Sequence, residues 1–217
     1  MGGEAAGIVD LTTGYDEAHR DRLAQAGRMV RVETIATQQV YLNPWMTVRE
    51  DEIVRPDGTP GIYGVVDKPA FALVIPMDGD RIMLVEQYRY PVGARRWEFP
   101  QGTAPDREDL DGPALAAQEL REETGLVART ITPLGTVDAA PGMTSQRGRM
   151  YLATGLTEGP PARETEEQDM RSAWFPRADV EAMIRRGEIA DAQSLAAFAL
   201  LLLSERDQLG SDQFSRR

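Results

Sequence analysis

Three glutamates crowd one short stretch of the chain. Glu119, Glu122 and Glu123 all lie within AAQELREETG, residues 116–125. If this stretch is helical, spacings of three and four residues place the three carboxylates on one face. Like charges at that spacing repel each other by roughly 0.2–0.5 kcal/mol per pair, and the negative end of the helix dipole disfavours them further. Some other feature should therefore compensate for the crowding.

Two interpretations of the crowded carboxylates are open: a solvated acidic face, or a site for divalent cations. Carboxylate oxygens are hard ligands that suit Mg²⁺ and Mn²⁺. The formal net charge of −11 argues against nucleic acid as a partner. An acidic protein that handles a phosphate ligand needs local arginines or metal ions to overcome its own field.

The composition excludes several other kinds of site. The chain has no cysteine, which rules out disulfides, thiolate zinc sites and cysteine nucleophiles. Its single histidine, His19, argues against histidine metal clusters and a Ser-His-Asp triad. No apolar run approaches the roughly 20 residues that span a bilayer. The first residues are acidic, unlike a signal peptide, so we expect a cytoplasmic protein without membrane contact.

The elements around the glutamates predict a mixed α/β or α+β fold. We expect a polar appendage over residues 1–28, a small antiparallel β subdomain over 29–67 and a main domain over 68–217. RPDGTPG, residues 55–61, predicts a hairpin turn in the subdomain. Two apolar strands joined by Asp78–Asp80 have runs continuous enough to be covered on both faces. A helix is predicted over 113–124, and two more follow over 178–188 and 190–207.

The order of Gly102, Glu108 and Gln118–Leu126 resembles the box of the Nudix hydrolases. That box reads Gly, five residues, Glu, seven residues, then Arg-Glu-apolar-any-Glu-Glu-any-Gly-apolar. LVEQYRYPVGARRWEFPQG, residues 84–102, and the C-terminal helical pair further resemble ADP-ribose and nucleotide-sugar pyrophosphatases. The similarity covers about residues 30–203.

The resemblance implies a Nudix α/β/α sandwich with a mixed sheet, and a Mg²⁺-dependent enzyme in which Mn²⁺ is also possible. The implied reaction hydrolyses the pyrophosphate of a nucleoside diphosphate linked to another group, with ADP-ribose giving AMP and ribose 5-phosphate as the favoured case. Glu119 and Glu123 would be the principal metal ligands. Glu122 would be a further ligand or hold a catalytic water, and the backbone carbonyl of Gln101 would add another ligand.

The resemblance also assigns a general base, substrate contacts and an oligomeric state. Glu166 in the acidic loop of residues 161–170 is the expected base, with Glu164 and Glu167 as the alternatives. Substrate contacts are expected at Arg89 and Glu86, which could instead serve structure at the strand end. More weakly, Glu98 could hydrogen-bond the ligand or a loop. Members of this subfamily are typically homodimers, and we expect one here.

The sequence departs from the box in three places, which leaves other functions open. Nine residues rather than seven separate Glu108 from Gln118, and Gln118 replaces an arginine that orients the carboxylates. Gln146 stands where ADP-ribose enzymes often carry an acid. The alternatives are hydrolysis of GDP-mannose, dinucleoside polyphosphates or other nucleotides, and a non-catalytic nucleotide-sensing module.

Overall fold

The computed structural model describes residues 31–103, 111–163 and 169–214. Glu108 and the predicted base Glu166, with its alternatives Glu164 and Glu167, lie outside these residues. The chain divides into two compact units. One comprises Met1–Gln38 and Asp51–Tyr63, and the other comprises Gln39–Glu50 and Gly64–Arg217.

The first three strands form a small antiparallel sheet in the order β1-β2-β3. They span β1 Glu33–Leu42, β2 Thr47–Val54 and β3 Pro60–Asp67. The predicted hairpin turn joins β2 to β3. There Asp57 accepts a hydrogen bond from the Thr59 N–H at 2.9 Å, and Gly58 adopts a φ of 83°. Glycine adopts a positive φ at little energetic cost, which explains why a glycine follows the aspartate in this turn.

A seven-stranded mixed sheet carries the rest of the fold. Its main path runs β10-β5-β4-β9-β8, while β6 pairs with β5 and β7 with β4. The β4–β9 pair is parallel, and the other pairs are antiparallel. The strands are β4 Phe71–Asp78, β5 Arg81–Arg89, β6 Ala94–Glu98, β7 Gln101–Thr103, β8 Leu126–Asp138, β9 Arg147–Glu158 and β10 Arg171–Pro176, with a 3₁₀ turn, η1, over Tyr90–Val92.

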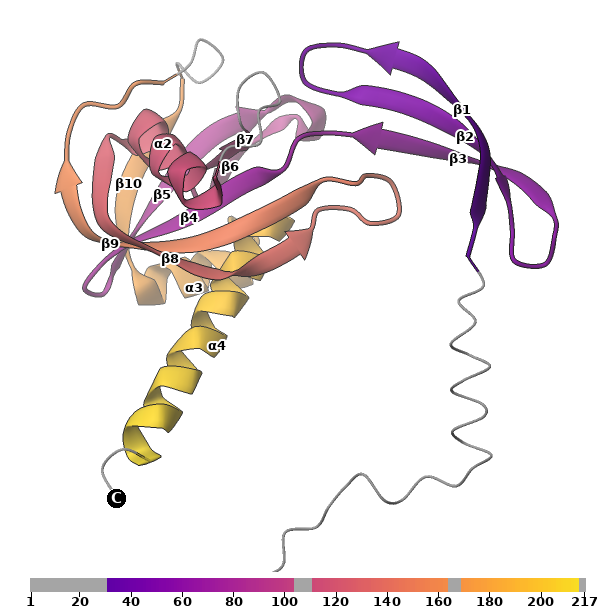
Figure 1. The fold of residues 1–217 in the computed structure, drawn as a ribbon. Helices are drawn as coiled ribbons and strands as arrows, with labels where there is room; N and C mark the ends of the chain where they lie inside the picture. The colour runs from indigo at the N-terminus through magenta and orange to yellow at the C-terminus, as the bar shows by residue number, and fades with distance from the viewer. Residues whose placement is uncertain (1–30, 104–110, 164–168, 215–217) are drawn as a thin grey trace, which may run out of the picture. The chain divides into compact units, whose positions relative to one another are not determined.

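Helices cover both faces of this sheet, so the predicted α/β/α sandwich is confirmed (Figure 1). Helix α2, Gly112–Thr124, packs on one face; α3, Arg177–Arg186, and α4, Ala192–Phe214, pack on the other. Strand β4 is covered on both faces, which explains why its sequence is apolar throughout. Phe71, Leu73 and Ile75 join the core beside α3 and α4, whereas Ala72 and Val74 join the core beside α2. In the described part of the chain, no helix has the length and apolar character needed to cross a bilayer.

One ion pair joins α3 to α4, and it should make part of the stability depend on pH. The Arg177 guanidinium donates to both carboxylate oxygens of Glu205, at 2.6 and 2.5 Å. These hydrogen bonds lower the pKa of Glu205 below its ordinary value, against the opposing effect of burial. A lowered pKa in the folded state contributes stability above the unfolded pKa and loses it as the pH falls through the folded pKa.

We therefore expect Glu205→Gln to destabilise the protein at neutral pH, by on the order of 1 kcal/mol for this partly exposed pair. As the pH falls through the lowered pKa of Glu205, the glutamate becomes protonated and the difference from wild type should shrink toward zero. The free energy of unfolding of both proteins, measured by urea titration at several pH values, tests this. An equal difference at every pH would contradict it.

Candidate active site

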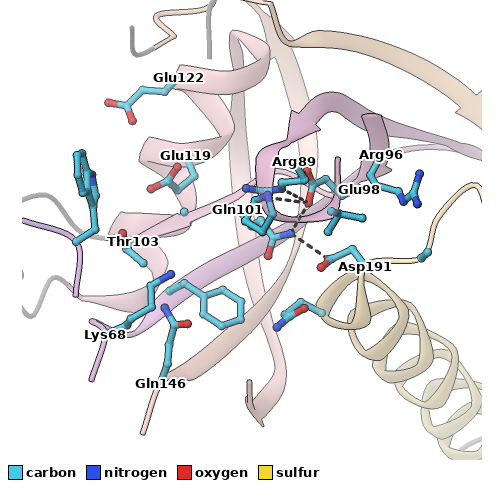
Figure 2. A pocket seen from close by; sticks show the side chains of 17 residues that line it. Lys68, Arg89, Arg96, Glu98, Gln101, Thr103, Glu119, Glu122, Gln146 and Asp191 are labelled. Atoms are coloured by element: carbon cyan, nitrogen blue, oxygen red, sulfur yellow. Dashed lines mark hydrogen bonds and ion pairs between the residues drawn. The ribbon is translucent and has the colours of Figure 1, made fainter. Parts of the chain in front are cut away.

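Helix α2 presents its glutamates in two different environments. Glu119 and Glu123, one turn apart, are 7 % and 1 % exposed, whereas Glu122 is only partly buried. Leu115 and Leu120 lie in the core beneath the helix and fix its rotation about its own axis. Glu119 and Glu122 line a cavity, and Figure 2 shows them on the helix beside it.

The short strand β7 lies directly against the two buried carboxylates. The Gln101 N–H donates to Glu123 Oε2 at 3.3 Å. A Cβ atom built on Gly102 would overlap the carboxylate of Glu119. Because β7 is paired with β4, with Leu73 opposite Gln101, the backbone that touches these carboxylates is anchored in the sheet. Glycine at position 102 is therefore required by space rather than by backbone conformation.

Hydrogen bonds and a cation at the carboxyl end of α2 offset the repulsion among the crowded glutamates. The carbonyl of Arg121 accepts from the N–H that follows the helix, and that of Glu122 accepts from the Ala162 N–H at 3.0 Å. The carbonyl of Glu123 accepts from the Arg163 guanidinium at 3.1 Å. A cation at the negative end of the helix offsets both the dipole and the neighbouring carboxylates. No local pattern in the sequence marks Arg163, because its partner lies 40 residues away.

Arg89 and Glu98, two of the predicted substrate contacts, form an ion pair beside the glutamates, in which Glu98 is buried and Arg89 is partly exposed. The Arg89 Nε and Nη2 atoms donate to the two Glu98 oxygens at 2.9 and 2.8 Å. Burial raises the pKa of Glu98 above its ordinary value, against the opposing bonds and charge of Arg89. At Arg89, burial lowers the pKa but is outweighed by Glu98, so that its pKa rises. The bidentate geometry favours the ionised pair, and Arg89 keeps its charge.

Glu86, the third predicted substrate contact, is placed differently. Its carboxylate accepts from Arg95 Nε at 2.9 Å, and Arg171 lies 3.9 Å away. Arg95 in turn binds Asp169, beyond β9 in the sequence. Glu86 is not among the described residues that line the cavity, although Arg89 and Glu98 are.

The cavity has a volume of about 670 Å³, which suits a ligand of nucleotide size. Figure 2 shows it bounded by the end of α2, by β7 and by the start of α4. Cations and carboxylates both line it, as a phosphate ligand with bound metal requires. The charged lining residues that the structure describes are Lys68, Arg89, Arg96, Glu98, Glu119, Glu122 and Asp191. The sequence did not single out Lys68, Arg96 or Asp191.

The ligand atoms near Gly102 are oxygens, the type that hard divalent cations bind. Two nearly buried carboxylates, at Glu119 and Glu123, lie against the strand that carries the Gln101 carbonyl. Glycine at position 102 leaves room for the Glu119 carboxylate beside that strand. Among the residues that the structure describes, no three acidic or histidine side chains are gathered closely enough to form a complete metal site. Any such cation therefore needs the carbonyl or water as further ligands.

Comparison with known proteins places the chain in a family. Residues 32–66 match the nucleoside diphosphate sugar hydrolase N-terminal domain, and residues 67–198 match the NUDIX domain. An ADP-ribose pyrophosphatase of Mycobacterium tuberculosis is 39 % identical over 76 % of this chain and 80 % of its own. A CMP-5′-(N-acetyl-N-hydroxy-3-aminopropyl)phosphonate hydrolase of Streptomyces rubellomurinus is 31 % identical over 75 % of this chain and 78 % of its own.

A solved structure supports the same fold. The crystal structure of an ADP compounds hydrolase superposes with a TM-score of 0.73 at 18 % identity, covering 82 % of this chain and 96 % of the other. The NUDIX domain match spans more than half of the chain, and it includes α2, β7 and most of the cavity lining. The chain belongs to the Nudix hydrolase family, as its box predicted, and it is an enzyme of that family that hydrolyses the pyrophosphate bond of nucleotide sugars.

Proposed function

We propose that the enzyme's substrate is ADP-ribose and that Mg²⁺ is its metal, with AMP and ribose 5-phosphate as products. The arrangement of Glu119 and Glu123 against β7 carries the proposal. It holds two buried carboxylates against one strand, and Glu119 also lines the cavity that Arg89, Lys68 and Arg96 line. The relatives named ADP-ribose pyrophosphatase support the choice of substrate.

Each residue has a definite role in the proposed reaction. Glu119, Glu123 and the Gln101 carbonyl would hold the metal, which when bound neutralises phosphate charge and activates water. Oxygen from water attacks one phosphorus, the bond from that phosphorus to the bridging oxygen breaks, and the proton passes to a base. We propose Glu166 as that base, with Glu122 assisting by holding the water. Glu164 and Glu167 remain the alternatives.

Arg89 would bind a phosphate oxygen while it keeps Glu98 as its partner. Its side chain is 39 % exposed, so part of the guanidinium reaches the cavity. Lys68 and Arg96 add positive charge in a protein whose net charge is −11. Local cations of this kind are what an acidic protein needs to attract a diphosphate. Glu86, held by Arg95, would act on the substrate only indirectly.

Another nucleotide substrate is the second candidate. A relative that is 31 % identical is named as a hydrolase of a CMP-linked phosphonate, whose base and leaving group differ from those of ADP-ribose. GDP-mannose and dinucleoside polyphosphates therefore belong in the same assay panel. The non-catalytic sensing function has only Gln118 in its favour.

We further propose that residues 29–67 form a dimerisation subdomain. Every residue of β1 is exposed, including large apolar side chains. Ile35, Val40, Tyr41 and Leu42 are each more than half exposed. Apolar side chains grouped on one exposed strand are typical of a surface that another chain covers.

Glu123→Gln should lower the turnover of ADP-ribose by at least about 100-fold, because it removes a charged metal ligand and leaves its size unchanged. Glu158→Gln, at an exposed position of β9, is the matched control and should retain wild-type activity. Products are identified by chromatography with Mg²⁺ present. Wild-type inactivity on every nucleotide of the panel would overturn the enzymatic function, and an active Glu123→Gln would overturn the metal site.

Gln118→Arg should orient the carboxylates of α2 more firmly and so strengthen Mg²⁺ binding or turnover. The Gln118 amide donates to Glu122 Oε1 at 3.2 Å, one turn along the helix. A guanidinium there would add an ion pair worth roughly 0.3–0.5 kcal/mol, or about a twofold effect. We expect the Mg²⁺ concentration for half-maximal rate to fall or kcat to rise by about that factor. If both stay at their wild-type values, Gln118 does not limit the site.

The dimer is tested by the mass of the protein in solution. Light scattering after gel filtration should give twice the 24.0 kDa of one chain. Tyr41→Asp, which places a charge on the exposed strand β1, should shift the mass toward one chain. A wild-type mass of one chain at micromolar concentration contradicts the proposal.

A further inference from the structure

The first turn of α4 is held by a buried cap. The N–H and the hydroxyl of Ser194 both donate to Asp191 Oδ2 at 2.8 Å, and the Leu195 N–H donates to the Asp191 carbonyl at 3.1 Å. Ser194 is fully buried. An aspartate that accepts from the third residue of a helix satisfies one of the amides that helix geometry leaves without partners.

The same two side chains reach across to the segment between β6 and β7. The Ser194 Oγ accepts from the Phe99 N–H at 3.0 Å, and Asp191 Oδ2 accepts from the Gln101 side-chain amide at 3.0 Å. The same amide also donates to Glu98 Oε2 at 3.0 Å. Figure 2 shows Gln101 between Glu98 and Asp191, joined to each.

This segment is bonded both by the sheet and from outside it. The Pro100 carbonyl accepts from the Val74 N–H of β4 at 3.0 Å. Strand β6 ends at Glu98 and β7 begins at Gln101, so Phe99 and Pro100 lie between the two ladders. Proline has no N–H, and the Phe99 N–H goes to Ser194. The start of α4 therefore supplies a hydrogen bond that no strand gives at this point.

The segment continues directly into the carboxylate site. The backbone N–H of Gln101 donates to Glu123, and the next residue, Gly102, abuts Glu119. An unbroken series of contacts thus runs from the cap of α4, through residues 98–102, to both buried glutamates of α2. The two ends of this series come from opposite faces of the sheet.

We propose that Asp191 and Ser194 are positioning residues for the metal-binding carboxylates, beyond their service as a helix cap. They set the place of Phe99 and Gln101, and through them the separation of β7 from Glu119 and Glu123. The inference rests on the proposed function, because it concerns the metal that those carboxylates hold. Residues that orient metal ligands through a second contact typically change metal affinity or activity by about 10–100-fold when removed.

Ser194→Ala is the first test, because it deletes both hydroxyl bonds and little volume. The probe is Mn²⁺, titrated into metal-free protein and followed by electron paramagnetic resonance without substrate. We expect Mn²⁺ binding about 10-fold weaker than in wild type, with a lower kcat and a smaller change in KM. Ser194→Thr keeps a hydroxyl and should restore most of the affinity.

Glu205→Gln is the matched control on the same helix. It removes the ion pair with Arg177, which anchors α4 far along the helix from its cap. It should lower the melting temperature without changing Mn²⁺ affinity. If Ser194→Ala loses only stability, as this control does, the cap is merely structural and the inference is wrong.

Gln101→Met provides a second route if Ser194→Ala does not fold. It keeps the backbone N–H and carbonyl of residue 101 and leaves the Ser194–Asp191 cap intact, but deletes both side-chain bonds. We expect weaker Mn²⁺ binding here as well, by several-fold. Unchanged binding in this variant, with wild type binding normally, overturns the inference. Failure of wild type itself to bind Mn²⁺ would instead overturn the proposed function, and the inference with it.

Discussion

The contact between Gly102 and the carboxylate of Glu119 constrains the geometry of the active site. Strand β7 is hydrogen-bonded into the sheet, and α2 packs on the same face of that sheet. A Cβ atom at position 102 would overlap the Glu119 carboxylate, so any side chain there would displace that carboxylate from its place against the strand. Glycine at position 102 therefore preserves the place of a carboxylate that the site needs.

Charge is managed locally in a chain with a large negative total. Arg163 closes the carboxyl end of α2, and Arg89 neutralises the buried Glu98. Each of these arginines makes bonds that hold a carboxylate or a carbonyl in place, and Arg89 also faces the cavity. The site thus uses its cations first to organise its own acidic groups. An isolated buried carboxylate would be far more costly.

Local patterns predicted the elements well and the long-range contacts poorly. The helix expected over 113–124 spans Gly112–Thr124, and the apolar run of β4 is covered on both faces. Helical periodicity placed three glutamates on one face, but Glu122 and Glu123 are about 100° apart around the axis. Glu119 and Glu123 face the protein interior and Glu122 does not, because the core residues fix the rotation of the helix about its axis.

The residues that the sequence did not reveal make contacts across large separations. Ser194 meets Phe99 across 95 residues, and Asp191 meets Gln101 across 90. An aspartate directly before a helical run is a helix-start signal, and Asp191 stands in that position before α4. It says nothing about which distant amide the same side chains will also bind. That choice follows from the topology of the sheet, which local propensity does not encode.

These separations also bear on the order in which the protein folds. Contacts between residues far apart in the chain require large loops to close before they return any stabilisation. The β8–β9 pair joins strands that are neighbours in the sequence, whereas the carboxylate site needs α2, β7 and the start of α4 together. In a chain emerging from the ribosome, the β8–β9 pair can therefore form before the carboxylate site is complete. With the proposed role of Asp191 and Ser194, hydrolysis would begin only once the C-terminal helix has docked.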